Sequence, residues 1–215
     1  MKTSVAASAW TTGKLAAVAA VTGTGMLLTG AGVYAALNAT ANNPVAQAVD
    51  SGTLKLVMAA NGAGFGSPIA GLAPGDVVNR HVQLTNSGTL PSEALTLGVV
   101  DATPTTLSTN ATTGLQVAVS QCSVAWTAGT GACAGITTAL IAATSVSALR
   151  TTPGTLIAGA IPAGTVIHLQ LKVTLPNSAE TTINGTPIAG TVQGLTSALT
   201  WNFSEVQRAA ATTSS

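Results

Sequence analysis

Apolar and polar residues alternate strictly in several short segments of the chain, and residues 77–86 show the pattern best. One face of the extended chain carries Val78, Arg80, Val82 and Leu84, and the other carries Val77, Asn79, His81, Gln83 and Thr85. A period of two is typical of a half-buried strand. Turn residues bound the segment, with Pro74-Gly75 before it and Asn86-Ser87-Gly88 after it. We therefore expect a strand of an antiparallel sheet that has one face in water.

The same alternation predicts further strands, of which 166–175 is the most regular. One face of this segment carries Ile167, Leu169, Leu171, Val173 and Leu175. The other expected strands are 54–58, 93–100, 115–119, 155–158 and 195–203. Residues 134–149 are apolar without a clean period, so a short crossing helix and a covering strand both stay open. Many short strands separated by turns indicate an all-β fold, a two-sheet antiparallel sandwich of jelly-roll or Greek-key type.

The first 36 residues have the pattern of a secretory signal helix. Lys2 and Lys14 give it a positive beginning, an apolar stretch follows over 15–28, and Tyr34-Ala35-Ala36 offers small residues for cleavage. Such a leader is removed on export, after Ala36 or, as the competing site, after Ala35. The alternative is an uncleaved anchor, because residues 15–37 are long enough to span a bilayer.

Composition narrows the choice of partners. Only 6% of the residues are charged. Two of the seven basic residues lie in the leader, which leaves five basic against six acidic residues in the rest of the chain. A near-neutral surface lacks the basic patch that nucleic acids require, so we expect no nucleic-acid partner. Low charge also gives little repulsion between copies of the chain, which favours self-association.

Three short motifs in the same order resemble those of the TasA/camelysin family, secreted bacterial proteins of the biofilm matrix and cell surface. They are Gly-Thr-Leu-Lys-Leu at 52–56, Leu-Ala-Pro-Gly-Asp at 72–76 and Val-Gln-Leu-Thr-Asn-Ser-Gly-Thr-Leu at 82–90. Residues 32–38 are similar to the family's cleavage region, which favours a mature chain that begins at Leu37. The resemblance is dense over 32–90 and looser over 165–203, where a strand pattern and Trp201 carry it.

The resemblance also suggests a division of the chain after the leader: a mobile segment 37–50, a sandwich domain 51–206 and a disordered tail 207–215. In the family, the segment after the cut can leave its own domain and complete the sheet of the next subunit, which is β-augmentation. Val45, Gln47 and Val49 form a weak alternating pattern there and are the expected donor strand. A frayed terminus is the open alternative.

Candidate chemistry is sparse. Cys122 and Cys133 are the only cysteines, and in an exported chain a pair this close most often forms one disulfide. His81 and His168 are far apart in sequence and fall on polar strand faces, so we expect two solvated histidines. No helix-borne His pair, Gly-x-Ser-x-Gly elbow or phosphate loop is present in the sequence. We therefore expect no catalytic residue, no metal site and no cofactor.

The leading hypothesis is a secreted structural protein of the bacterial extracellular matrix or cell surface, similar to TasA, that is not an enzyme. Its partners would be further copies of itself, signal peptidase during export and possible other matrix proteins. Two alternatives stay open: a camelysin-type secreted metallopeptidase with His81 or His168 at a metal, and a monomeric surface adhesin.

Overall fold

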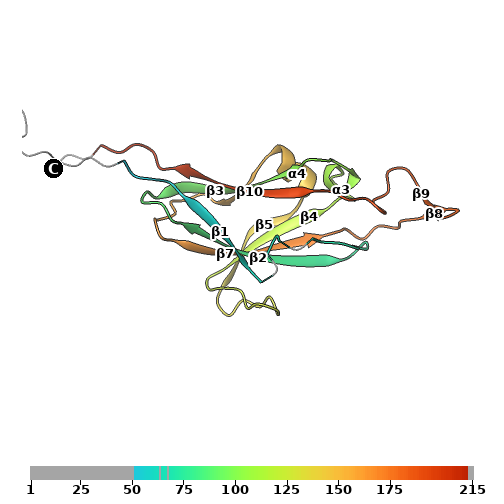
Figure 1. The fold of residues 1–215 in the computed structure, drawn as a ribbon, viewed down its shortest axis with the longest axis horizontal. Coiled ribbons are helices and arrows are strands. Elements are labelled where there is room, and N and C mark those ends of the chain that lie inside the picture. The colour runs from blue at the N-terminus through green and yellow to red at the C-terminus, as the bar shows by residue number, and fades with distance from the viewer. Residues whose placement is uncertain (1–50, 63, 67, 213–215) are drawn as a thin grey trace, which may run out of the picture. The chain divides into compact units, whose positions relative to one another are not determined.

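The computed structural model of the protein describes residues 51–62, 64–66 and 68–212 (Figure 1). It confirms the all-β sandwich of antiparallel sheets. The leader, its cleavage between Ala36 and Leu37, and the donor strand with Val45, Gln47 and Val49 lie outside the described residues. Within these ranges, no helix has the length and apolar character needed to cross a membrane.

The larger sheet, sheet A, has five strands. In order across the sheet they are β1 (Leu56–Asn61), β2 (Val77–Asn86), β7 (Val166–Thr174), β4 (Gln116–Cys122) and β5 (Thr137–Ser145). The central strands β2 and β7 pair over nearly their full length, from Val77 opposite Thr174 to Thr85 opposite Val166. This long register follows from the two most regular alternating segments of the sequence, because a slip by one residue would turn their apolar faces to water.

The smaller sheet, sheet B, has three strands. They are β10 (Leu199–Gln207), β3 (Ser92–Asp101) and β6 (Gly154–Ile157), in that order. Two short helices, α3 (Thr106–Thr109) and α4 (Val146–Thr151), connect the sheets, and β8 (Thr182–Ile183) and β9 (Thr186–Pro187) form a separate hairpin. Asn184 and Gly185 make its turn, both with positive φ, as a two-residue hairpin turn requires.

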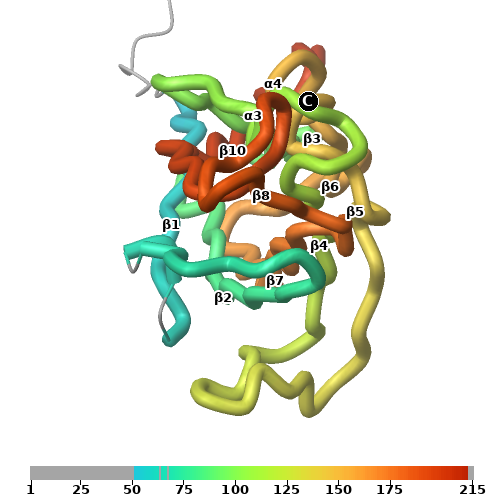
Figure 2. Tube along the Cα trace, turned by 90° about the vertical axis from the view of Figure 1, so that its right-hand side faces the viewer, coloured from blue at the N-terminus to red at the C-terminus, as the bar shows by residue number. Residues whose placement is uncertain are grey.

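The core lies between the inner faces of the two sheets. Its fully buried side chains are short and aliphatic, and include Leu84, Leu95, Leu97, Leu169 and Leu171. The sandwich has two different sides (Figure 2): β1 and β10 lie along one, and β5 and β6 along the other. The second side is covered by α4, whose Val146 and Leu149 are buried.

The described chain starts at one end of the sandwich, and β10 starts at the other. Thr53 accepts hydrogen bonds from the backbone N–H groups of Thr89 (2.8 Å) and Leu90 (3.0 Å), beside the end of β2. A Cβ at Gly88 would overlap the Thr53 carbonyl oxygen, so glycine permits this close approach. Leu199, in contrast, pairs with Asp101 at the far end of β3. Figure 1 shows the two places at opposite ends of the sandwich.

The expected strands agree with the structure in place and differ at some boundaries. The predicted strand 195–203 begins only at Leu199, because β3 ends at Asp101 and offers the preceding residues no partner. Gln207, which we placed in the tail, is the last residue of β10, and the N–H of Ala209 donates to Glu93 at 2.8 Å. For residues 134–149 the sequence leaves a covering strand and a short helix open, and the structure contains both, because strand β5 is followed directly by helix α4.

Candidate functional site

The side of the sandwich between β1 and β10 is open, and we call it the seam. Within the described chain, β1 pairs only with β2 and β10 pairs only with β3. Each strand therefore presents one row of backbone N–H and C=O groups outward. Unpaired edges of this kind are templates for an additional strand.

The inner face of β1 is only partly covered: Leu56 packs against the core, but the residues after it do not. The register places Leu56, Met58 and Ala60 opposite Asn86, Leu84 and Val82, whose side chains are buried in the core. Met58 is nevertheless 51% exposed and Ala60 is exposed as well. Sheet B thus ends one strand short of covering sheet A, and an apolar strip of β1 is left uncovered.

Aromatic side chains mark the inner boundary of the seam. Trp201 and Phe203 point inward from β10, and both are partly buried. Phe65, from the loop after β1, stacks on Trp201 with ring centroids 5.7 Å apart and lies 6.4 Å from Phe203. The three rings close the centre of the sandwich behind the seam, so the core does not extend into the opening.

Glu205 is the acidic side chain on the inner face of β10. Both its carboxylate oxygens are inaccessible to water and have no hydrogen-bond partner among the described residues. Burial raises the pKa of this carboxyl group above its ordinary value, and the nearby Ser92 hydroxyl offsets the effect only in part. Ionisation of Glu205 therefore costs more free energy in this domain than it would in water.

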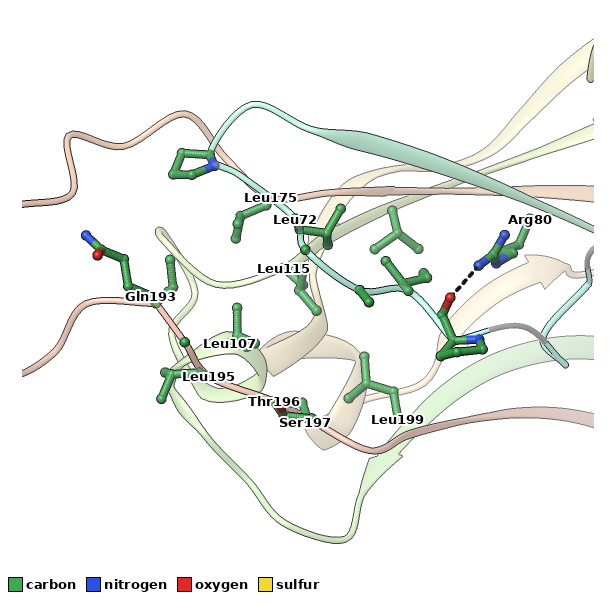
Figure 3. A pocket seen from close by; sticks show the side chains of 18 of the residues that line it. Leu72, Arg80, Leu107, Leu115, Leu175, Gln193, Leu195, Thr196, Ser197 and Leu199 are labelled. Carbon is green, nitrogen blue, oxygen red and sulfur yellow. Dashed lines mark hydrogen bonds between the residues drawn. The ribbon is translucent and has the colours of Figure 1, made fainter. Parts of the chain in front are cut away.

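A cavity of about 640 Å³ lies at the far end of the sandwich, where β10 begins (Figure 3). The loops before β2 and before β10 form two of its walls, and leucines supply much of the lining. The leucines are Leu72, Leu107, Leu115, Leu175, Leu195 and Leu199. Arg80 is the charged residue in the lining, and its guanidinium donates to the Pro68 carbonyl at 3.4 Å.

The two histidines lie on the same, outer face of sheet A. His81 and His168 occupy neighbouring strands, with His81 opposite Gln170 and His168 opposite Gln83. The Gln170 amide nitrogen lies 3.0 Å from His81 Nε2, and Trp126 packs on the His81 ring at 5.4 Å between centroids. Burial lowers the pKa of His81. The expectation of two solvated histidines is therefore only partly right, because both side chains are partly buried and Trp126 packs on the His81 ring.

The predicted disulfide between Cys122 and Cys133 is confirmed, with 5.8 Å between the Cα atoms. It closes the loop that carries Trp126. The Trp126 indole N–H donates to the His168 carbonyl at 3.2 Å, and its own carbonyl accepts from the Asn61 side chain at 2.9 Å. The disulfide loop is thus held against the outer face of sheet A over both histidines.

A metal centre has little support in this arrangement. The described part of the chain contains no group of three His, Cys, Asp or Glu side chains close enough to bind one ion. The Nε2 atom of His81 is engaged by Gln170, and the His168 Nδ1 atom is buried without a partner. Three protein ligands are the usual minimum for a catalytic zinc.

Sequence reasoning missed the seam, the cavity and the role of Trp126. The seam depends on which strands become neighbours, and alternation within one strand carries no such information. The cavity is built from loops that have no period at all. The Asn184-Gly185 dipeptide was a usable signal for the β8–β9 hairpin.

Comparison with known proteins gives one family. The family model described as camelysin metallo-endopeptidase matches residues 12–212. No curated protein sequence matches the chain. Among solved structures, AvmM, described as catalysing macrocyclization in alchivemycin A biosynthesis, aligns over 74% of this chain and 91% of its own, at 11% identity and a TM-score of 0.27. That likeness is too weak to carry an argument.

Proposed function

The chain belongs to the camelysin metallo-endopeptidase family, the TasA/camelysin family of secreted and cell-surface proteins, and from this premise we propose that it is a structural protein that assembles by strand donation. The segment 37–50 of one copy would add to the seam of the next copy, in the bacterial extracellular matrix or on the cell surface. The observation that supports the proposal is the seam itself, where sheet B ends one strand short of covering β1.

A strand added to the outer edge of β10 would satisfy two needs at once. Its backbone would pair with the outward N–H and C=O groups of β10, and its side chains would cover Met58 and Ala60 of β1. Main-chain hydrogen bonds supply affinity in β-augmentation, and shallow apolar pockets supply selectivity. Val45 and Val49 fit such pockets, whereas Gln47 between them adds little, so the backbone contributes most.

The start of the domain limits where the neighbouring copy can sit. Thr53 is already fixed by Thr89 and Leu90, and only three residues separate it from Val49. A donor strand that ends at Val49 must therefore enter a copy packed directly against this end. A head-to-tail contact of this kind uses two different surfaces, and where it does not close into a ring it propagates as a filament.

We also propose that the protein is not a peptidase. Strand donation needs no catalytic side chain, and His81 is engaged by Gln170 and Trp126. The family name supports the alternative of a metallopeptidase, with His81 or His168 at the metal. Purified protein should show no chelator-sensitive cleavage of a casein substrate. Activity that is abolished in both His81→Ala and His168→Ala would contradict this part of the proposal.

A monomeric adhesin is the second alternative, and the β8–β9 hairpin favours it. Ile183 of β8 and Ile188, directly after β9, are exposed by 64% and 42%. The hairpin projects beyond the sandwich in Figure 1. An adhesin would stay monomeric under conditions in which the strand-donation account predicts filaments.

Assembly of three variants separates these accounts. The chain that begins at Leu37 should form filaments that sediment, whereas the chain that begins at Asp50 should stay monomeric with an unchanged circular dichroism spectrum. Val45→Asp with Val49→Asp should weaken assembly at least tenfold, and Val124→Asp, an exposed valine of the disulfide loop, should have no effect. Normal filaments without residues 37–49 would refute strand donation.

A further inference from the structure

We propose that the cavity at the far end of the sandwich binds a free fatty acid, with the carboxylate at Arg80 and the aliphatic chain among the leucines. The cavity shares Phe65 and Trp201 with the inner boundary of the seam, but its Arg80 end lies beyond β1. β1 lies beside residues 81–86 of β2, whereas the cavity is lined by Arg80 and by Pro74 and Leu72 before the strand. The inference therefore does not depend on strand donation.

The shape and lining of the cavity fit an aliphatic chain. Its volume of about 640 Å³ lies within the range of about 300–1,000 Å³ that is usual for small-molecule sites. Figure 3 shows Arg80 at one end, Gln193 at the other, and Leu72, Leu107 and Leu115 between them. Burying methylene groups in such a lining is favourable because it removes apolar surface from water. An elongated apolar ligand gains most from this geometry.

The charge of the lining favours an anionic head group. Arg80 is a cation, and none of the other residues that line the cavity is charged. A guanidinium carries five N–H donors in a planar fork that matches a carboxylate. The Arg80 guanidinium also donates to the Pro68 carbonyl at 3.4 Å, which places the side chain at this end of the cavity. An aliphatic alcohol or amine would gain the apolar contacts without this ion pair.

Residues that line the cavity provide probes of ligand binding. Trp201 lines the cavity, so its fluorescence reports on an occupant. The other two tryptophans, Trp10 and Trp126, can be replaced by Phe in the full chain. Leu195 is 37% exposed at the wall, and Leu195→Phe should fill space there without disturbing the buried core.

Titration of the full chain carrying Trp10→Phe and Trp126→Phe with dodecanoate tests the proposal. We expect a saturable, one-to-one change in Trp201 emission. Arg80→Gln should weaken dodecanoate binding at least tenfold and dodecanol binding less than twofold. Lys172→Gln, an exposed cation on the outer face of sheet A, should change neither. Leu195→Phe should weaken both ligands.

Three outcomes would overturn the proposal. The first is no saturable response to dodecanoate, checked by isothermal titration calorimetry on the unsubstituted chain in case the tryptophan replacements disturb folding. The second is equal weakening of dodecanoate and dodecanol by Arg80→Gln, which would leave only non-specific apolar binding. The third is an equal Trp201 response to phosphatidylglycerol vesicles, which would indicate a membrane surface instead of a free fatty acid.

Discussion

The two sides of the sandwich are built from the same kinds of residue, but one side is closed by a helix and the other is open. On the β5–β6 side, α4 follows β5 directly and inserts Val146 and Leu149 between the sheets. Gly154 of β6 lies so close that a Cβ would meet Ile141 and Leu149 at 2.7 and 3.1 Å. On the β1–β10 side no helix follows, and Met58 remains half exposed.

Under the proposed function, this difference places stability on one side of the sandwich and association on the other. The closed side removes apolar surface from water within one copy, so it stabilises the folded chain. The open side leaves apolar surface and backbone groups for which the described chain supplies no cover. In the proposed assembly, a strand from another copy would cover this surface and pair with these groups.

The largest expected effect comes from truncating a side chain on the closed side. Leu149→Ala should lower the free energy of unfolding by about 2–5 kcal/mol, because it removes buried methyl groups and leaves a cavity. Met58→Ala on the open side should lower it by less than about 1 kcal/mol. Urea unfolding of the two variants measures both values. Equal losses would mean that the two sides are equally packed.

The fold could be predicted from the sequence because its central strands alternate so regularly. The predicted strand 77–86 coincides with β2, and 166–175 with β7, since both alternate apolar and polar residues over nine or more positions. The segment 134–149 could not be resolved because β5 is an edge strand with little burial, and α4 is too short to show a helical period.

The next largest effect concerns the disulfide loop on the outer face of sheet A. Cys122→Ser with Cys133→Ser should lower the free energy of unfolding by about 2–3 kcal/mol, the loop-closure value for this spacing. The pKa of His81 should rise toward its ordinary value of 6.5, because a looser loop lets water reach the ring. NMR titration measures the shift. A His81 pKa that stays low would show that Trp126 covers the ring without the disulfide.

The candidate site was much less predictable than the fold. In the sequence, Trp201 served only as one feature of the family resemblance. Its contact with Phe65 joins residues far apart in the chain. The polar strand faces of His81 and His168 were predicted correctly, but the packing of Trp126 on the His81 ring depends on how the disulfide loop folds back. Such contacts depend on tertiary packing, which a period along the sequence does not encode.

A smaller, pH-dependent effect should separate Glu205 from other acidic groups. Burial raises the pKa of the Glu205 carboxyl group above its ordinary value of 4.5. The stability that the domain has with this group protonated is therefore fully present below pH 4.5 and is lost as pH rises through the folded pKa. Glu205→Gln should therefore stabilise the domain at pH 7 and change its stability little at pH 4. Urea unfolding at both pH values measures this. Equal stabilisation at both pH values would contradict a raised pKa.

The most direct test compares the amide hydrogen exchange of two sheet edges before and after assembly. If strands are donated to the seam, β10 amides should exchange at least tenfold more slowly in filaments of the Leu37 chain than in the monomer that begins at Asp50. The β5 amides on the closed side should exchange at the same rate in both. Slower exchange in β5 with no change in β10 would contradict the account.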